Sequence, residues 1–310
     1  MRRSYFFIAL LWCGYAAAQD TSVIIDEHRF TLSEVVVRNN FDYRTLLTQI
    51  KEDTTFYKAF RNLRVLGFTS YNDIRMLDKN GNTKASLFSK TRQNRADGCR
   101  TMDVLEEKTT GDFYDKKHQY NYLTPELYAG LFFTNGKICG EDNIVKGRNM
   151  SLANKKGMEK HKEQLKMLFF NPGKKIPGIP FIGDKLDLYD ASAHKLYDYR
   201  LDVQEFHGNP AYVFTITPKE DKQKSDRVVV DQMITWFDLK TLEVLSRTYS
   251  LSYKAGVYDF DVSMEVEMTR FNGLTVPKIL RYKGDWDVIF KKRERAVFTA
   301  TLFGFEEGRR

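Results

Sequence analysis

The sequence predicts a mainly β protein of the α+β class, with a meandering antiparallel sheet that has one apolar and one solvated face. Three observations predict this class. Aromatic residues, mostly tyrosine and phenylalanine, make up 14% of the chain, and they favour strands. From Leu196 onwards, apolar and polar residues alternate, as in strands with one buried face. Short turns join these runs, so successive strands are expected to pair antiparallel.

The first 18 residues are expected to form a cleavable secretory signal. Arg2 and Arg3 precede an apolar run that is too short to span a bilayer. Ala16-Ala17-Ala18 then supplies the small residues that a signal peptidase requires. We therefore expect cleavage near Ala18 and a periplasmic or secreted location. The alternatives are an uncleaved membrane anchor and lipidation of Cys13, which the bulky Trp12 before it disfavours.

Residues 19–310 are expected to form a single β-rich domain. An apolar content of 42% and a charged content of 29% are typical of a globular chain. The length is sufficient for one large β domain, with two ordinary domains as the alternative. Residues 93–184 interrupt the strand pattern with Gly, Asp and scattered tyrosines, and they are interpreted as a partly helical, basic insertion.

The start of the domain is predicted to combine short strands with helical structure. Ser22–Ile25 and Glu34–Arg38 are predicted strands, because the second contains consecutive valines that resist a helix. From residue 40 to 63, apolar residues recur at three- and four-residue spacing, which predicts an amphipathic helix. Asp53-Thr54-Thr55 interrupts the pattern, so one kinked helix and two short helices both remain open.

A hairpin and two further helices are expected next. Apolar and small polar residues alternate from Leu66 to Met76, Asn80-Gly81 forms the turn, and Ala85 to Ser89 returns. Thr124 followed by Pro125 predicts a helix start. Gly157–Phe170 is predicted to be a basic helix.

The C-terminal part is predicted to be a series of adjacent strands. The clearest alternation places Asp259, Asp261, Ser263, Glu265 and Glu267 on the solvated face, opposite an apolar row. Basic residues on the following strands, such as Arg281 and Arg295, are expected to pair with this acidic row. The predicted strands are Leu196–Val203, Tyr212–Ile216, Val228–Phe237, Val244–Tyr253, Tyr258–Met268, Lys278–Tyr282, Trp286–Lys292 and Ala296–Phe303.

Two cysteines, Cys99 and Cys139, remain after removal of the signal. An even number of cysteines in an oxidising compartment favours a disulfide between them. Two separate buried thiols are the alternative.

The positive charge is concentrated in one segment. Residues 146–175 contain nine basic and two acidic residues, which gives a net charge of +7, whereas the whole chain carries +8. Because the rest is nearly neutral, nucleic acid is not an expected partner. A solvated helix face is one interpretation of the segment. Contact with an anionic membrane surface is the other, for which the candidate residues are Lys155, Lys156, Lys160, Lys162 and Lys166.

The sequence contains no catalytic signature of a hydrolase, a dinucleotide-binding protein or a metalloprotease. Gly178 and Gly183 have the spacing of a phosphate-binding loop, but Asp184 stands where lysine is required. The five histidines are widely separated. We therefore expect no enzymatic activity, no cofactor and no metal, and an unrecognised hydrolase ranks third among the possible functions.

The order of these elements resembles the envelope lipoprotein-carrier superfamily of LolA/LolB/LppX-like proteins. The similarity covers residues 41–87 and 196–303, including Trp236-Phe237-Asp238-x-Lys240-Thr241 and then Arg247-x-Tyr249-x-Leu251-x-Tyr253. It implies a strongly curved antiparallel sheet, an unclosed half-barrel, whose concave face is covered by an N-terminal helix and further helices. No functional residue of the family can be placed on this sequence.

The resemblance implies an exported periplasmic protein that binds a lipid or other apolar ligand, with transport between envelope membranes as a possible role. An aromatic-rich sheet face under an incomplete cover would form such a site. If the cover fits completely, the same residues form an ordinary core, and the protein is a non-enzymatic envelope scaffold or interaction protein with no cavity. The candidate residues of the ligand cavity are Tyr212, Phe214, Trp236, Tyr258, Phe260, Val262 and Met264.

Overall fold

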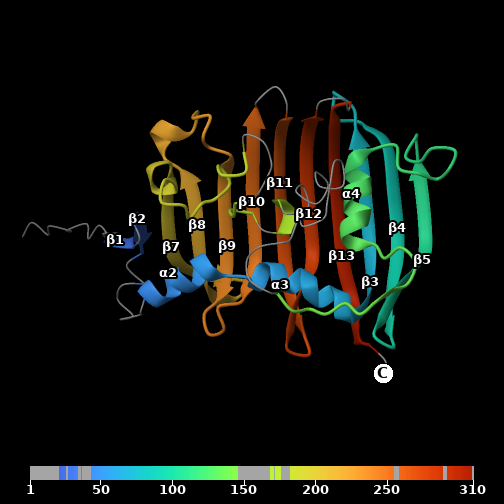
Figure 1. Cartoon of the computed structure of the whole chain (residues 1–310), viewed down its shortest axis with the longest axis horizontal. Coiled ribbons are helices and arrows are strands. Elements are labelled where there is room, and N and C mark those ends of the chain that lie inside the picture. Colours follow the sequence, from blue (N-terminus) through green and yellow to red (C-terminus); the bar gives the residue numbers. More distant parts are fainter. Residues whose placement is uncertain are drawn as a thin grey trace, which may run out of the picture.

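The computed structural model describes residues 21–25, 27–33, 36, 43–145, 168–170, 172–175, 182–254, 258–288 and 292–308. Its strands form one sheet (Figure 1). They are β1 (Thr21–Ile25), β2 (His28–Leu32), β3 (Leu66–Leu77), β4 (Thr83–Ala96), β5 (Cys99–Thr110), β6 (Ile138–Cys139), β7 (Tyr197–Phe206), β8 (Asn209–Pro218), β9 (Val230–Asp238), β10 (Val244–Lys254), β11 (Tyr258–Phe271), β12 (Leu274–Val288) and β13 (Glu294–Glu307).

The predicted fold class is confirmed. The strand order is β1-β2-β7-β8-β9-β10-β11-β12-β13-β3-β4-β5-β6. Every pairing is antiparallel except that of β2 with β7, where Phe30 lies opposite Tyr199. The outermost strands β1 and β6 do not pair with each other, so the curved sheet is an unclosed half-barrel. All described strands share this sheet, which supports our proposal of a single domain from 19 to 310.

The strands from β7 to β13 form the predicted meander, with one correction. Lys278–Tyr282 and Trp286–Lys292 were predicted as separate strands, but β12 runs unbroken from Leu274 to Val288. Gly284 lies inside β12, and a Cβ there would lie 1.9 Å from the hydroxyl oxygen of Tyr282. This glycine therefore makes room for a neighbouring ring, and it does not interrupt the strand.

The N-terminal half differs from the prediction at two places. The strand expected at Glu34–Arg38 is absent at Val36, the only described residue there, which is helical. Instead of the expected strand, β2, which lies earlier in the chain, pairs with β7. In addition, β4 extends to Ala96 and β5 runs from Cys99 to Thr110, so the segment that leaves the sheet begins after Thr110 and not at residue 93.

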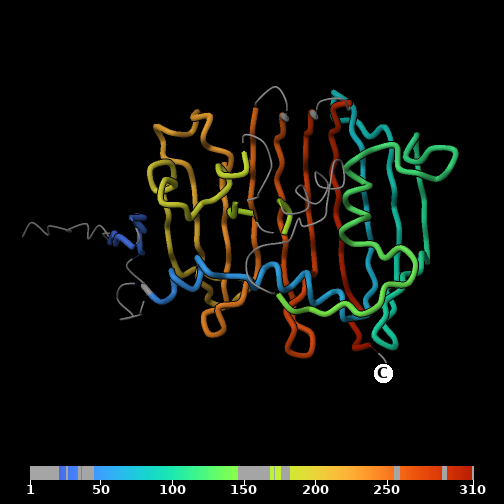
Figure 2. Tube along the Cα trace, in the orientation of Figure 1, coloured from blue at the N-terminus to red at the C-terminus, as the bar shows by residue number. Residues whose placement is uncertain are grey.

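Helices cover one face of the sheet, which we call the covered face (Figure 1). They are α2 (Tyr43–Glu52), α3 (Thr55–Asn62) and α4 (Leu123–Phe132). Figure 2 shows that residues 182–196 also cross this face, over β7 to β9. The region from 40 to 63 thus contains two short helices. They separate at Asp53, whose Oδ1 accepts hydrogen bonds from Thr55 N (2.7 Å) and Thr55 Oγ1.

A buried ion pair fixes this junction to the sheet. Arg247 of β10 donates from Nη2 to Asp53 Oδ2 (3.2 Å) and from Nε to Thr235 Oγ1 (2.9 Å). The side chains of Arg247 and Asp53 are only 11% and 6% exposed. The guanidinium also lies over the ring of Phe56, 4.5 Å from its centroid. The start of α3 is therefore held by charge, hydrogen bonds and a cation–π contact.

The predicted faces of β11 are correct. Phe260, Val262 and Met264 are buried on the covered face, and Asp261 is exposed. On the other face Arg281 donates to Glu265 (2.8 Å) and Glu267 (2.9 Å). This is the predicted pairing of the acidic row with a basic residue of the next strand.

Candidate functional site

An apolar crevice lies between α4 and the sheet. Its floor comes from β12 and β13, and one wall is α4. The free space within it is about 20 Å³, which is about the room that one water molecule needs. It is lined by Leu123, Thr124, Leu127, Tyr128, Leu131, Phe169, Tyr282, Trp286, Lys292, Glu294 and Phe298.

A buried carboxylate holds the first turn of α4 above this crevice. Glu294 of β13 accepts hydrogen bonds from Leu123 N (2.7 Å), Thr124 N (2.9 Å) and Thr124 Oγ1 (2.9 Å). The two backbone N–H groups are donors that a helix start leaves unpaired. A negative charge is favourable at the N-terminus of a helix. Thr124 lies inside α4, whose N-cap residue is Tyr122, and a distant strand supplies the side chain that caps the first turn.

The middle of α4 rests on β3 and β13 through Tyr128. Its hydroxyl donates to Asn72 Oδ1 (2.6 Å), and its ring lies 4.7 Å from that of Phe298. Burial raises the pKa of the Tyr128 hydroxyl far above its ordinary value, so this group stays a neutral hydrogen-bond donor. The helix is thus attached at its first turn and at one central tyrosine, with the apolar crevice beside both.

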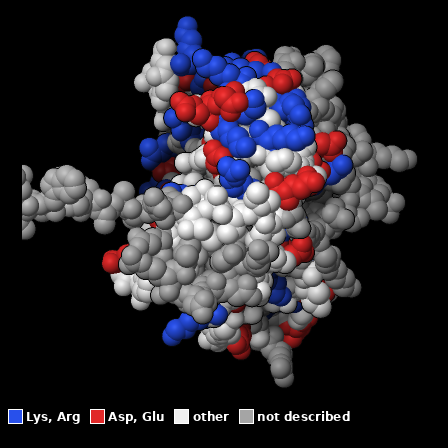
Figure 3. All heavy atoms as spheres, turned by 90° about the vertical axis from the view of Figure 1, so that its left-hand side faces the viewer, with Lys and Arg blue, Asp and Glu red and all other residues white. Residues whose placement is uncertain are grey.

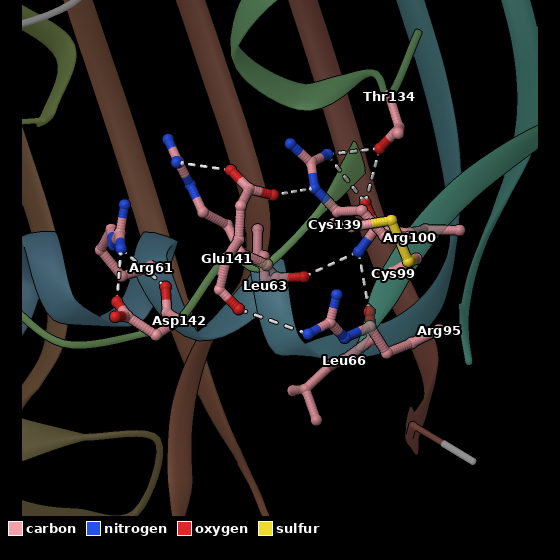
Figure 4. Close-up of polar contacts among 12 residues, drawn as sticks. Arg61, Leu63, Leu66, Arg95, Cys99, Arg100, Thr134, Cys139, Glu141 and Asp142 are labelled. Carbon is pink, nitrogen blue, oxygen red and sulfur yellow. Dashed lines mark hydrogen bonds and ion pairs between the residues drawn. A yellow bond between two sulfur atoms is a disulfide. The ribbon is translucent and has the colours of Figure 1, made fainter. Parts of the chain in front are cut away.

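A second, polar pocket lies at the other end of α4, and we call it the arginine pocket (Figure 4). Its free space is about 60 Å³. Three guanidinium groups and a ring of aromatic side chains enclose it. It is lined by Tyr57, Phe60, Arg61, Leu63, Arg64, Phe68, Gln93, Arg100, Gly130, Leu131, Phe132, Phe133 and Phe170.

Glu141 bridges two of these arginines. Its Oε1 accepts from Arg64 Nη1 (2.8 Å), and its Oε2 accepts from Arg100 Nε (2.5 Å). Burial by itself would raise the pKa of Glu141, but the hydrogen bond from Arg100 and the charges of Arg64, Arg100 and Arg61 outweigh it. The pKa of Glu141 is therefore below its ordinary value, and the carboxylate is ionised at neutral pH.

The structure joins Cys99 and Cys139 by a disulfide, with their Cα atoms 4.0 Å apart. These cysteines lie directly opposite each other on β5 and β6. The bond places Glu141, two residues further on, beside Arg100 (Figure 4). Gln93 completes the wall, since its Nε2 donates to the carbonyls of Leu63 and Leu66, both at 2.7 Å.

Five of the seven predicted cavity residues lie buried on the covered face, namely Tyr212, Phe214, Phe260, Val262 and Met264. None of them lines the crevice. Two of them adjoin it: the ring centroid of Phe260 lies 5.2 Å from that of Trp286, and Met264 lies opposite Tyr282 on β12. The side chain of Tyr258 lies outside the described residues.

Trp236 was predicted to line the ligand cavity, but it lies on the other face of the sheet. The register of β8 and β9 places Trp236 opposite Val213, whereas Phe214 lies opposite Thr235. Neighbouring residues on a strand point to opposite faces, so Trp236 faces away from Tyr212 and Phe214. It packs there against Phe206, with ring centroids 5.2 Å apart. Its sequence neighbour Phe237 occupies the covered face instead.

The predicted membrane-contact residues Lys155, Lys156, Lys160, Lys162 and Lys166 lie outside the described residues. Two other lysines of the basic segment are described. Lys174 lies over the ring of Tyr189, 4.2 Å from its centroid, and Lys175 pairs with Asp184 at 2.7 Å. Figure 3 views the molecule from the left-hand side of Figure 1, and it shows basic and acidic side chains mixed over the upper part of that side.

A further hollow of about 320 Å³ has both Lys175 and Asp184 in its lining. Its other lining residues include Asp187, Asp190 and Arg227, so both cations and carboxylates line it. Within the described ranges, no group of three or more His, Cys, Asp and Glu side chains is arranged to hold a metal ion. Nor does any helix in those ranges have the length and apolar character needed to cross a membrane.

The fold and the crevice define a one-sheet protein whose helices form a cover over an apolar face. No family model matches the chain, and no curated protein matches it. Among solved structures, it is similar to a DUF1329 family protein from Desulfovibrio piger. The two share 10% identity over 84% of this chain and 92% of that chain, with a TM-score of 0.27.

The chain is also similar to a structure described as an outer membrane lipoprotein-sorting protein domain from Vibrio parahaemolyticus. The identity is 8% over 83% of this chain and 93% of that chain, and the TM-score is 0.28.

Proposed function

We propose that the protein is exported to the cell envelope and binds a lipid or other apolar ligand between α4 and the covered face. The observation that carries the proposal is the crevice, where leucines of α4 face aromatic residues of β12 and β13. Ligand pockets are typically concave and apolar, with a few polar groups at fixed positions. Lys292 and Glu294 are the charged groups in this lining.

Binding requires α4 to move. A space of about 20 Å³ is too small for an acyl chain, since one water molecule already fills it. The hydrogen bonds to Glu294 and Asn72 hold α4 closed over β13, so α4 acts as a lid that opens when these bonds break. A protein that carries its ligand between envelope membranes would need such a lid, and we include this carrier role in the proposal.

The alternative is an envelope scaffold in which α4 never opens and the crevice is ordinary core. Trp286 lines the crevice, whereas Trp236 faces the other side of the sheet. A fatty acid with bromine atoms along its chain quenches tryptophan at contact. We expect it to quench the mature protein, and to quench a Trp286→Phe variant much less because Trp236 remains out of reach.

Two leucine substitutions test whether the fatty acid binds in the crevice. Leu127→Phe fills the crevice and should weaken binding of the fatty acid. Leu105→Phe makes the same change at an exposed residue of β5 and should leave binding unchanged. If the wild-type protein shows no quenching and no lipid co-purifies with it, the scaffold alternative is correct.

The export part of the proposal has its own measurement. N-terminal sequencing of the protein from an envelope fraction should begin at or near Gln19. An intact Met1 in a cytosolic fraction would contradict it. The proposal includes no enzymatic activity and no cofactor, in keeping with the absence of catalytic motifs from the sequence.

A further inference from the structure

The arginine pocket carries more positive charge than its own carboxylates neutralise. Within the described part of the chain, five cationic side chains contact residues 141–143. That segment supplies two carboxylates, of Glu141 and Asp142. The cations are Lys58, Arg61, Arg64, Arg95 and Arg100, of which Arg61, Arg64 and Arg100 line the arginine pocket itself.

One guanidinium donor of the pocket is unused. Arg61, which lines the pocket, has a buried Nε that makes no hydrogen bond to any described residue. Burial also lowers the pKa of Arg64, which reflects the cost of removing a cation from water. Buried donors without partners are unfavourable, so an additional anion in this pocket would be stabilised.

The surroundings strengthen such an interaction. Tyr57, Phe60, Phe132, Phe133 and Phe170 supply aromatic walls around the guanidinium groups. Charges interact more strongly where apolar groups exclude water. The free space of about 60 Å³ exceeds that of one water molecule. Guanidinium groups bind carboxylates and phosphates through paired hydrogen bonds, so both anions match these donors.

The arginine pocket adjoins the apolar crevice. Leu131 of α4 lines both. Phe169 lines the crevice, and its neighbour Phe170 lines the arginine pocket. One face of α4 therefore joins an apolar space to a cationic one.

We infer that the ligand is an anionic amphiphile, whose carboxylate or phosphate head group binds Arg64 and Arg100 while its chain lies under α4. This inference rests on the proposed function, because it assigns the head group of the ligand that the crevice binds. Glu141 already lies between these two arginines, so it competes with the head group. The disulfide holds this competitor in place through Cys139.

The test compares ligands of one chain length by titration calorimetry with the mature protein. The three ligands are dodecanoate, dodecyl phosphate and uncharged dodecanol. Loss of a charged hydrogen-bond pair weakens binding by about tenfold or more. We therefore expect at least one anionic ligand to bind about tenfold more tightly than dodecanol, and the tighter of the two identifies the head group.

Three variants locate the effect. Arg64→Gln should weaken the anionic ligands about tenfold and leave dodecanol unchanged. Arg92→Gln removes a guanidinium that pairs with Glu306 and lines neither site, so all affinities should be unchanged. Glu141→Gln removes the competing charge and should tighten binding of the anions only. Thermal melting confirms that each variant is folded.

The outcomes separate the two proposals. Equal binding of all three ligands by the wild-type protein would overturn the head-group site and leave the apolar site standing. Equal weakening of dodecanol and the anions by Arg64→Gln would show that Arg64 only supports the structure, and it would also overturn the inference. Absence of binding by every ligand would overturn the proposed function together with the inference.

Discussion

Replacement of Glu294 by glutamine tests how α4 is held. The carboxylate accepts three hydrogen bonds at the start of the helix, and the residue is only 9% exposed. Glutamine has the same shape but one acceptor oxygen, so its NH₂ group would face a backbone N–H. At least one buried donor would then lose its partner.

The magnitude follows from these contacts. Loss of a hydrogen bond to a charged group costs about 1.5–3 kcal/mol, and loss of a negative charge at a helix N-terminus adds about 0.3–1 kcal/mol. We expect Glu294→Gln to lower the free energy of unfolding by about 2–4 kcal/mol. Urea unfolding followed by circular dichroism measures this loss. Hydrogen exchange should show that the amides of α4 lose protection before those of β13.

The control lies on the same strand. Glu306 pairs with Arg92, but its side chain is 56% exposed, so Glu306→Gln should change stability by no more than about 0.5 kcal/mol. A loss below about 1 kcal/mol for Glu294→Gln, with protection of α4 unchanged, would refute the idea that this carboxylate holds the lid. If the idea is correct, Glu294→Gln should also speed ligand exchange.

Three more predictions concern stability. Arg247→Met should lower the free energy of unfolding in urea by about 3–5 kcal/mol, because it leaves the buried Asp53 carboxylate without its charge partner. A loss as small as that of a surface substitution would mean that the ion pair is solvated. The lowered pKa of Glu141 stabilises the fold above the ordinary pKa of 4.5, and this contribution disappears as the pH falls through the folded-state pKa. Glu141→Gln should therefore flatten the acid limb of a stability–pH curve, and an unchanged limb would exclude this role. Phe260→Ala should cost about 3–5 kcal/mol if the site is close-packed, and a much smaller loss together with reduced ligand binding would favour an open cavity at Phe260.

The sequence predicted the meander because its strands alternate apolar and polar residues. It missed β5 because that strand is exposed or half-buried along its whole length and has no apolar row, and it missed the end of β4 because that part of the covered face is polar. Asn72 donates to Ser70 and Ser89, both at 3.2 Å, and Ser70 hydrogen-bonds Thr91 at 2.8 Å. These side chains are buried, yet a search for apolar residues at every second position does not detect them.

The site was harder to predict than the fold. The strongest alternation, in β11, identified buried residues near the middle of the sheet. The crevice instead combines α4 with β12 and β13, and no local pattern indicates that these segments meet. One signal was present, since Glu294 stands on the apolar side of β13 in line with Ala296 and Phe298. A lone carboxylate in an apolar row indicates a buried partner elsewhere in the chain.

The pairing of β3 with β13, in which Ile74 lies opposite Phe298, has a consequence for how the chain reaches its native state. β3, in the N-terminal part of the chain, can pair with β13 only when nearly the whole polypeptide is present. Contacts between residues so far apart in sequence slow folding, and until they form, β3 and β12 each expose an unpaired edge. Such edges pair readily with other chains. Deletion of residues 294–310 would leave both edges open permanently and α4 without its cap, so the shortened protein is expected to aggregate rather than form a smaller sheet.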